Sequence, residues 1–169
     1  MDIKELKTEF IISEVIDHSK HKLILLDLIN KIPNNPYEGI SKTDYNLPAA
    51  FERKYLDYFY LNIAKNIMAQ QQKYFKAEGW DITYGWFQQY QEKSWHQYHT
   101  HPKTNFTNVY FLELPDNQLK TSVKVKDKEY CYSAKEGQII TFPAHLLHCS
   151  KPIRNKRKTI ISFNSDFVY

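Results

Sequence analysis

The chain has 169 residues and a mass of 20.2 kDa, with 42% hydrophobic and 15% aromatic residues, which is long enough for one domain with a sizeable core and too short for two comfortable ones. The formal net charge of +4 is only mildly basic, so charge alone selects neither an anionic small molecule nor a nucleic acid as partner. No apolar run reaches the roughly 18 residues of a membrane helix and the N-terminus lacks a signal-peptide pattern, so we expect a cytoplasmic protein without a membrane segment.

The first third of the chain has the hydrophobic spacing of helices. Ser19 is a candidate N-cap, and apolar residues then recur at three- and four-residue spacing until Pro33 ends the run. These apolar residues are Leu25, Leu26, Ile29 and Ile32. A loop rich in Pro, Asn and Gly covers residues 33–48, and we consider residues 34–47 a candidate lid.

A long helix is expected over residues 51–75. Its apolar stripe is the pattern of a helix packed on a core, and its aromatic residues are expected to serve packing. The stripe consists of Leu56, Phe59, Ile63 and Ile67, widened by Tyr60, Ala64 and Met68.

After Gly79 the sequence changes to short segments rich in β-branched and aromatic residues, bounded by turn residues. The segments are 80–91, 108–114, 121–132, 137–143 and 157–169. We therefore predict a single α+β domain over residues 1–169, in which helices within 1–78 buttress a β-sandwich of 79–169. The strand pattern alone also allows a barrel. The cupin-like jelly roll, a double-stranded β-helix, is the arrangement in which the histidines described next would meet, and we expect it as the core. Cys131 and Cys149 have no metal-binding spacing and are expected to be free thiols.

Three histidines lie within the six residues 96–101, just before a predicted strand. On an extended strand His99 and His101 project from one face, whereas His96 projects from the other. His148, just past the strand 137–143, is the candidate third ligand, and His145 is expected at the surface. Three such ligands would leave coordination positions open on a metal ion, as in non-haem iron oxygenases.

Four segments together resemble a known family. The sequences HTHP (99–102), TNVYFLEL (107–114), EGQIITFPAHLLHCSKP (136–152) and RKTIISFN (157–164) are similar to a phage and bacterial group of iron(II)- and 2-oxoglutarate-dependent oxygenases. The resemblance covers about residues 86–166. It implies Fe(II), 2-oxoglutarate and dioxygen as cofactors, and a hydroxylation coupled to decarboxylation of 2-oxoglutarate to succinate.

The resemblance also implies roles for individual residues. His99 and His148 would be metal ligands, and His101 occupies the place where most relatives have a carboxylate. The far carboxylate of 2-oxoglutarate would need a cation, because a charge-assisted hydrogen bond holds it best. Residue type favours Arg157 for this role, whereas counting back from the Ser-Phe-Asn end of the segment favours Lys158. We prefer Arg157.

Further pocket residues follow from the same resemblance. Tyr98 and Tyr110 flank the metal region and are candidates to hydrogen-bond the cosubstrate or substrate. Thr107 and Asn108 lie where the family has Ser-Gly and are expected to line the pocket. The primary substrate, a small molecule or a protein side chain, is not identified by any motif, and the oligomeric state stays open.

Two other functions are compatible with the sequence. A cupin-type metalloenzyme would use the same three histidines for dioxygenation or isomerisation without 2-oxoglutarate. A nucleic-acid-binding module would use the basic segment 151–158 together with Lys124, Lys126 and Lys128. We consider nucleic acid the weaker candidate, because basic residues at a turn are usually only solvated.

Overall fold

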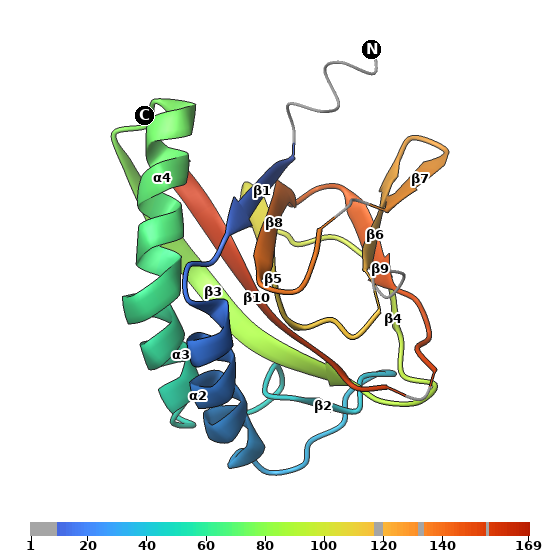
Figure 1. Ribbon diagram of the computed structural model, residues 1–169. Coiled ribbons are helices and arrows are strands. Elements are labelled where there is room, and N and C mark those ends of the chain that lie inside the picture. Colours follow the sequence, from blue (N-terminus) through green and yellow to red (C-terminus); the bar gives the residue numbers. More distant parts are fainter. Residues whose placement is uncertain (1–9, 117–119, 132–133, 155) are drawn as a thin grey trace.

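The computed structural model describes residues 10–116, 120–131, 134–154 and 156–169, and its main feature is a pair of antiparallel sheets with helices on one side (Figure 1). In spatial order, the larger sheet contains Ile11–Glu14 (β1), Gln138–Pro143 (β8), Phe106–Glu113 (β5), Lys158–Val168 (β10), Gly79–Tyr90 (β3) and Lys42–Thr43 (β2). The smaller sheet contains His96–His99 (β4), Leu147–Ser150 (β9), Thr121–Val125 (β6) and Lys128–Cys131 (β7). This arrangement fits the expected jelly roll.

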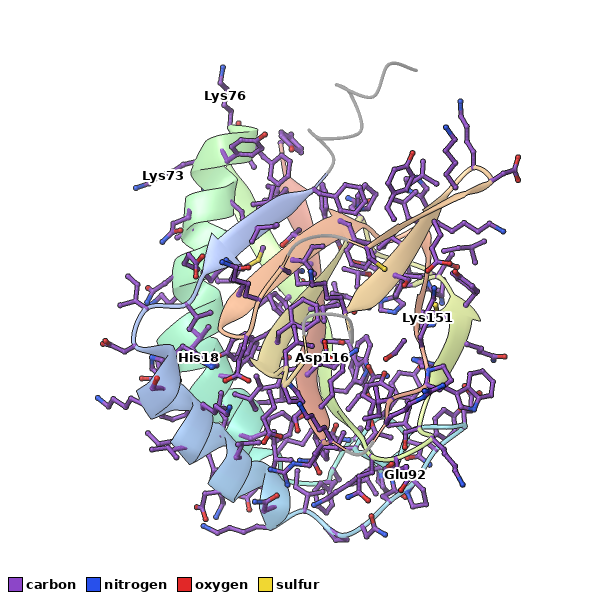
Figure 2. The ribbon with its side chains drawn as sticks, turned by 45° about the vertical axis from the view of Figure 1, so that its right-hand side comes forward. His18, Lys73, Lys76, Glu92, Asp116 and Lys151 are labelled. Carbon is purple, nitrogen blue, oxygen red and sulfur yellow. The ribbon has the colours of Figure 1, made fainter. Side chains whose placement is uncertain are left out.

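The helices pack against the outer face of the larger sheet (Figure 1). They are His18–Asn30 (α2) and a continuous helical run made of Lys54–Phe59 (α3), the π-helical segment Tyr60–Ala64 (η1) and Lys65–Phe75 (α4). The predicted stripe of the long helix is buried, as expected from its spacing. Lys73 and Lys76 project away from the sheet at the C-terminal end of α4, so this helix keeps its charged face in water (Figure 2).

The start of α2 differs from the prediction. The helix begins at His18, and its N-cap is Asp17 in the left-handed conformation (φ 55°), so Ser19 is not the cap. A tertiary contact holds the first turn of this helix, because the His18 Nδ1 atom lies 2.7 Å from the Tyr110 hydroxyl. Within the described ranges, no helix combines the length and apolar character that a membrane crossing requires.

Two strands in the first third were not predicted. Strand β1 pairs with β8, and β2 pairs with residues Gln88 and Gln89 of β3. Both are short, and their pairing comes from partners far along the chain, so local composition does not mark them. The two cysteines are free thiols, as expected.

The core has two parts, one on each face of the larger sheet. Between helices and sheet lie Leu25, Phe59, Met68, Tyr110 and Phe163, each fully buried. The space between the two sheets holds a second cluster, which includes Val109, Phe111, Val123, Phe142 and Ile160. Strand β5 alternates between these clusters, so its odd-numbered residues Val109 and Phe111 face the smaller sheet while Tyr110 faces the helices.

Candidate metal centre

The three predicted histidines meet at one end of the space between the sheets. His99 is the last residue of β4, His101 follows two residues later, and His148 lies in β9 directly opposite His99 in the strand pairing. One ring nitrogen from each residue lies within 4.8 Å of the others. The ring centroids of His99 and His148 are 4.2 Å apart, and those of His101 and His148 are 4.8 Å apart. The structure therefore brings together all three residues that sequence singled out.

Backbone carbonyls orient two of these imidazoles. The Nδ1 atom of His99 lies 2.8 Å from the carbonyl oxygen of Gln97, and the Nδ1 atom of His148 lies 2.9 Å from that of Leu146. A carbonyl can only accept, so each Nδ1 carries the proton and each Nε2 keeps its lone pair. Such a partner on the second ring nitrogen is what metal-ligating histidines usually have.

Side chains orient the third imidazole. The Nδ1 atom of His101 lies 2.7 Å from Oδ1 of Asn164 in β10 and 2.8 Å from the hydroxyl of Thr107 in β5. The Trp86 ring packs beside this imidazole, with the two ring centroids 5.2 Å apart. Thr107 is thus near the site, as expected, whereas Asn164 was missed because nothing in its local sequence points to residue 101. All three Nε2 atoms are left for a ligand.

Burial keeps these imidazoles neutral. Loss of solvation lowers the pKa of His148 to about 2 and that of His101 to about 4, and it lowers the pKa of His99 as well. The neutral ring is the form that binds a divalent cation. The donor set therefore fits a metal ion such as Fe(II), Zn(II) or Ni(II), for which imidazole is a suitable ligand.

A fourth histidine joins the cluster against expectation. His96 was predicted to project from the opposite face, but its ring centroid lies 4.0 Å from that of His99. The physical reason is a register shift between His96 and His99 in the pairing with β9, which breaks the two-residue alternation. His96 hydrogen-bonds Gln88 through Nδ1 at 3.2 Å, and burial lowers its pKa to about 3.

Two cavities adjoin the histidines. The outer one has a volume of about 350 Å³ and is bounded by residues of the loop 37–45, by Tyr84, Trp86 and Gln88 of β3, and by β4 with residues 100–102 that follow it. The inner one, between the two sheets, has only about 20 Å³ and is walled by Tyr90, Val109, Ser150 and Ile160, together with all four histidines. His96, His99 and His101 line both cavities, so the candidate ligands stand at the boundary between them.

Lys158, rather than Arg157, lies on the inner side. The Lys158 side chain is fully buried, its Nζ donates a 2.9 Å hydrogen bond to the Ser150 hydroxyl, and it lies 5.0 Å from the ring centroid of Tyr90. Burial lowers its pKa to about 7. Ser150 and Tyr90 both line the inner cavity, so the Lys158 amine lies behind this part of the cavity wall.

Arg157 occupies a different position from the one we preferred for it. Its guanidinium forms a two-point ion pair with Glu113, with both nitrogen–oxygen distances 2.9 Å, and its side chain is 38% exposed. Alternation along β10 is the cause, because Arg157 precedes Thr159 on the face that meets Glu113, whereas Lys158 shares the inner face with Ile160 and Ser162.

The remaining predicted pocket residues line neither cavity. Tyr98 is 41% exposed and lies beside Glu129 and Cys149 on the far side of the smaller sheet. Tyr110 faces the helices and contacts His18. Asn108 also faces the helices, where its side chain bonds Ser165 and Thr141. His145 is exposed, as expected.

The sequence matches no protein-family model and no curated protein. Solved structures are similar in fold, and three of them illustrate the range. An oxidoreductase of the 2OG-Fe(II) oxygenase family from Burkholderia pseudomallei has a TM-score of 0.74 and 12% identity, covering 97% of this chain and 87% of that one. HygX from Streptomyces hygroscopicus, with nickel and 2-oxoglutarate bound, has a TM-score of 0.69 and 9% identity, with coverages of 98% and 87%.

The third structure is a prolyl hydroxylase from Trichoplax adhaerens in complex with a peptide fragment of the hypoxia inducible factor oxygen degradation domain. Its TM-score is 0.63 and its identity 14%, with 96% of this chain and 86% of that one covered. At such low identities the likeness concerns the backbone and not individual roles. The chain therefore has the fold that these 2-oxoglutarate–Fe(II) oxygenases and hydroxylases share.

Proposed function

We propose that the protein is an iron(II)- and 2-oxoglutarate-dependent oxygenase that hydroxylates its substrate. One observation carries the proposal, namely that three imidazoles, whose Nε2 atoms have no hydrogen-bond partner among the described residues, line the inner cavity, while a buried lysine bonds Ser150 in the wall of the same cavity. The imidazoles suit a divalent metal, and the lysine amine suits the far carboxylate of a dicarboxylic acid. The fold shared with 2-oxoglutarate–Fe(II) oxygenases supports the same function.

His99, His101 and His148 would hold the iron through Nε2. With Fe(II) bound, dioxygen and 2-oxoglutarate would supply oxidative decarboxylation to succinate and hydroxylation of a C–H bond. Three neutral ligands leave the full charge of +2 on the metal. A dianionic cosubstrate would offset that charge, which compensates for the carboxylate that His101 replaces.

Lys158 would bind the far carboxylate of 2-oxoglutarate. No carboxylate in the described part of the chain forms an ion pair with this amine, and its hydrogen-bond partner is the neutral hydroxyl of Ser150. A buried, unpaired amine is costly unless a ligand supplies the opposite charge. The inner cavity has room for about one water molecule, so binding requires the side chains between His148 and Lys158 to move apart.

The order of the strands supports a specific type of jelly roll. Consecutive strands from β3 to β10 alternate between the two sheets, apart from the hairpin of β6 and β7. This alternation supports a double-stranded β-helix with the histidines at its open end. We propose that residues 1–169 form a single domain, in which helices within 1–78 buttress this β-core of residues 79–169.

A cupin-type metalloenzyme that does not use 2-oxoglutarate is the second candidate. The all-histidine ligand set favours it, because the usual 2-oxoglutarate site includes a carboxylate. Nucleic-acid binding has less support. In the basic segment 151–158, Lys151 pairs with Glu129, Arg157 pairs with Glu113 and Lys158 is buried, so three of its charges are already engaged or inaccessible.

Anaerobic titration of the metal-free protein with Fe(II) and then 2-oxoglutarate tests the proposal. The chelate of the two has a visible charge-transfer band, and we expect it in the wild type, its loss in His99→Ala, and a need for at least tenfold more 2-oxoglutarate in Lys158→Met. Arg157→Met is the matched control and should titrate as the wild type does. Metal uptake without a band at any 2-oxoglutarate concentration would favour the cupin-type enzyme.

A further inference from the structure

The outer cavity has an aromatic wall. Tyr45 is its centre, with ring centroids 5.8 Å from Tyr37, 6.0 Å from Tyr84 and 5.4 Å from Trp86, and all four rings line the cavity. The rings of Tyr84 and Trp86 stack, with their centroids 5.4 Å apart. Trp86 also packs on His101, so the aromatic surface runs from the mouth of the cavity to a candidate metal ligand.

One carboxylate lies on the same cavity. Glu38 is next to Tyr37 and lines the cavity, and its side chain is 45% exposed. Among the described residues, its ion-pair contact is with Nε2 of His96, at 3.8 Å. No lysine or arginine lines the cavity. No lysine or arginine of the described residues therefore faces this carboxylate in the cavity.

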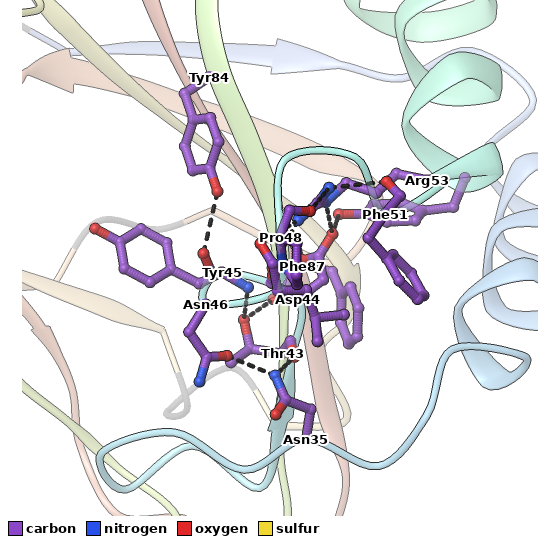
Figure 3. Close-up of polar contacts among 12 residues, drawn as sticks. Asn35, Thr43, Asp44, Tyr45, Asn46, Pro48, Phe51, Arg53, Tyr84 and Phe87 are labelled. Carbon is purple, nitrogen blue, oxygen red and sulfur yellow. Dashed lines mark hydrogen bonds and ion pairs between the residues drawn. The ribbon is translucent and has the colours of Figure 1, made fainter.

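The loop that carries these groups is held in place. The Asp44 carboxylate accepts hydrogen bonds from Arg53 Nε at 2.9 Å, the Tyr55 hydroxyl at 2.6 Å and the Phe87 backbone N–H at 3.0 Å (Figure 3). In the same view, the Tyr84 hydroxyl donates to the carbonyl of Tyr45 at 3.1 Å. The aromatic wall is thus already formed without a ligand.

The turn at Glu38 is fixed from the other side. The Trp95 backbone N–H donates to the Gly39 carbonyl at 2.9 Å, and a Cβ on Gly39 would lie 2.6 Å from the Trp95 carbonyl oxygen. Only glycine permits this approach, and Gly39 also has φ +155°. The backbone of the turn that carries Glu38 is therefore fixed beside the aromatic wall.

We propose that the outer cavity binds a cationic alkylammonium group of the primary substrate, with Glu38 as its counter-charge and the rings of Tyr37, Tyr45, Tyr84 and Trp86 as its aromatic surface. Ring faces attract such cations at distances of up to about 6 Å, most strongly where water is excluded. The inference rests on the proposed oxygenase function only in calling the bound molecule a substrate. The cavity volume of about 350 Å³ accommodates a small amine or a single lysine side chain.

The test uses choline and its neutral isostere 3,3-dimethylbutan-1-ol, titrated by NMR into the protein without metal or 2-oxoglutarate. We expect choline to bind at least tenfold more tightly than the isostere, and Glu38→Gln to remove that preference. Glu52→Gln, at an exposed glutamate outside the cavity, is the control and should keep it. Equal binding of both probes to the wild type, or an unchanged preference in Glu38→Gln, would overturn the proposal.

Measurements of Fe(II) binding distinguish the cation site from a role of Glu38 as a metal ligand. They also distinguish failure of the cation site from failure of the oxygenase proposal. If Glu38→Gln weakens Fe(II) binding as strongly as His99→Ala does, the carboxylate belongs to the metal centre and the cation site is wrong. If choline binds as expected but the wild type gives no Fe(II)–2-oxoglutarate band, the cation site stands and the oxygenase proposal fails. With active protein, succinate formed with free amines but not with a lysine-containing peptide identifies a small-molecule source of the cation, and the reverse identifies a protein source.

Discussion

The Nδ1 atom of His101 lies 2.7 Å from Oδ1 of Asn164, which joins the segment after β4 to the last strand of the larger sheet. The contact fixes the proton on Nδ1 and points Nε2 toward His99 and His148. Because β10 is the central strand between β3 and β5, the position of His101 depends on the most extensively paired strand of the fold. Asn164 is thus a positioning residue for His101 in the candidate metal centre.

Replacement of Asn164 tests this role. In Asn164→Ala the His101 Nδ1 atom loses the nearer of its two partners and keeps only the Thr107 hydroxyl. We expect Fe(II) or Co(II) affinity to fall by about 10- to 100-fold, the usual effect of removing such a partner. Asn164→Asp keeps an acceptor oxygen at the same place and should retain affinity near that of the wild type. Metal titration followed by a chelator measures both, and equal affinity of Asn164→Ala and the wild type would contradict the role.

Lys158 allows a prediction that separates cosubstrate binding from folding. Lys158→Met removes a buried amine and replaces it by an apolar side chain of similar length, so we expect no loss of free energy of unfolding. The same change should weaken 2-oxoglutarate binding at least tenfold, because the far carboxylate would lose the one buried Lys or Arg among the described residues. Denaturant unfolding and 2-oxoglutarate titration are measured on the same preparation. An unfolded variant would show instead that the Ser150–Lys158 contact is structural.

The lowered pKa of Lys158 predicts how binding depends on pH. In the free protein the amine has a pKa of about 7, so it loses its charge as pH rises through 7, whereas both carboxylates of 2-oxoglutarate stay ionised. Binding above pH 7 therefore requires proton uptake, and the apparent affinity should fall by up to about tenfold per pH unit. Lys158→Arg keeps its charge over this range and should show a flat profile. A flat profile in the wild type would contradict the assignment of Lys158 as the anchor.

The same shift predicts the stability of the free protein. Since the pKa of Lys158 is lower in the folded state than the ordinary value of 10.5, the unfolded chain binds more protons between pH 7 and 10.5. The contribution of this lysine to the free energy of unfolding therefore rises with pH across that window and is constant below it. The difference between wild type and Lys158→Met isolates the effect, and a difference independent of pH from 7 to 10 would show that the amine is not buried in solution.

The sequence predicts the metal centre better than its surroundings. His99 and His101 could be chosen because their two-residue spacing at a strand is a local, periodic pattern. His148 could be chosen from its place after a later strand and from the family resemblance. Arg157 was preferred because guanidinium suits carboxylates, but alternation along β10 decides which side chain faces inward, and it selects Lys158. His96 lies beside His99 because of a register shift in β4, and the two-residue alternation of a regular strand does not predict such a shift.

Residues that act through distant contacts were not predictable. Asn164 meets His101 across 63 positions, and Glu38 reaches the site from a loop whose sequence has no regular pattern. The loop that we consider a candidate lid contributes a wall of the outer cavity and is held through Asp44 and β2. Such contacts depend on the tertiary arrangement of segments, and local propensity does not encode it.

Asp44 provides a final prediction, because it connects the loop wall to the core. Its carboxylate is fully buried and is paired with Arg53, whose side chain is 12% exposed. Asp44→Ala leaves the guanidinium, the Tyr55 hydroxyl and the Phe87 N–H without this acceptor, so we expect a loss of about 3–5 kcal/mol in the free energy of unfolding. Arg157→Ala breaks a more exposed pair and should cost at most about 1 kcal/mol.

Urea unfolding of the two variants beside the wild type measures this contrast, and choline titration of Asp44→Ala at low temperature, where it is folded, measures its effect on the wall. We expect the variant to lose the preference for choline over 3,3-dimethylbutan-1-ol, because Tyr45 and Glu38 are no longer held in position. If Asp44→Ala is as stable as Arg157→Ala, the buried carboxylate is not what anchors the loop. In that case the pairing of β2 with β3 and the Gly39–Trp95 contact must hold the wall by themselves.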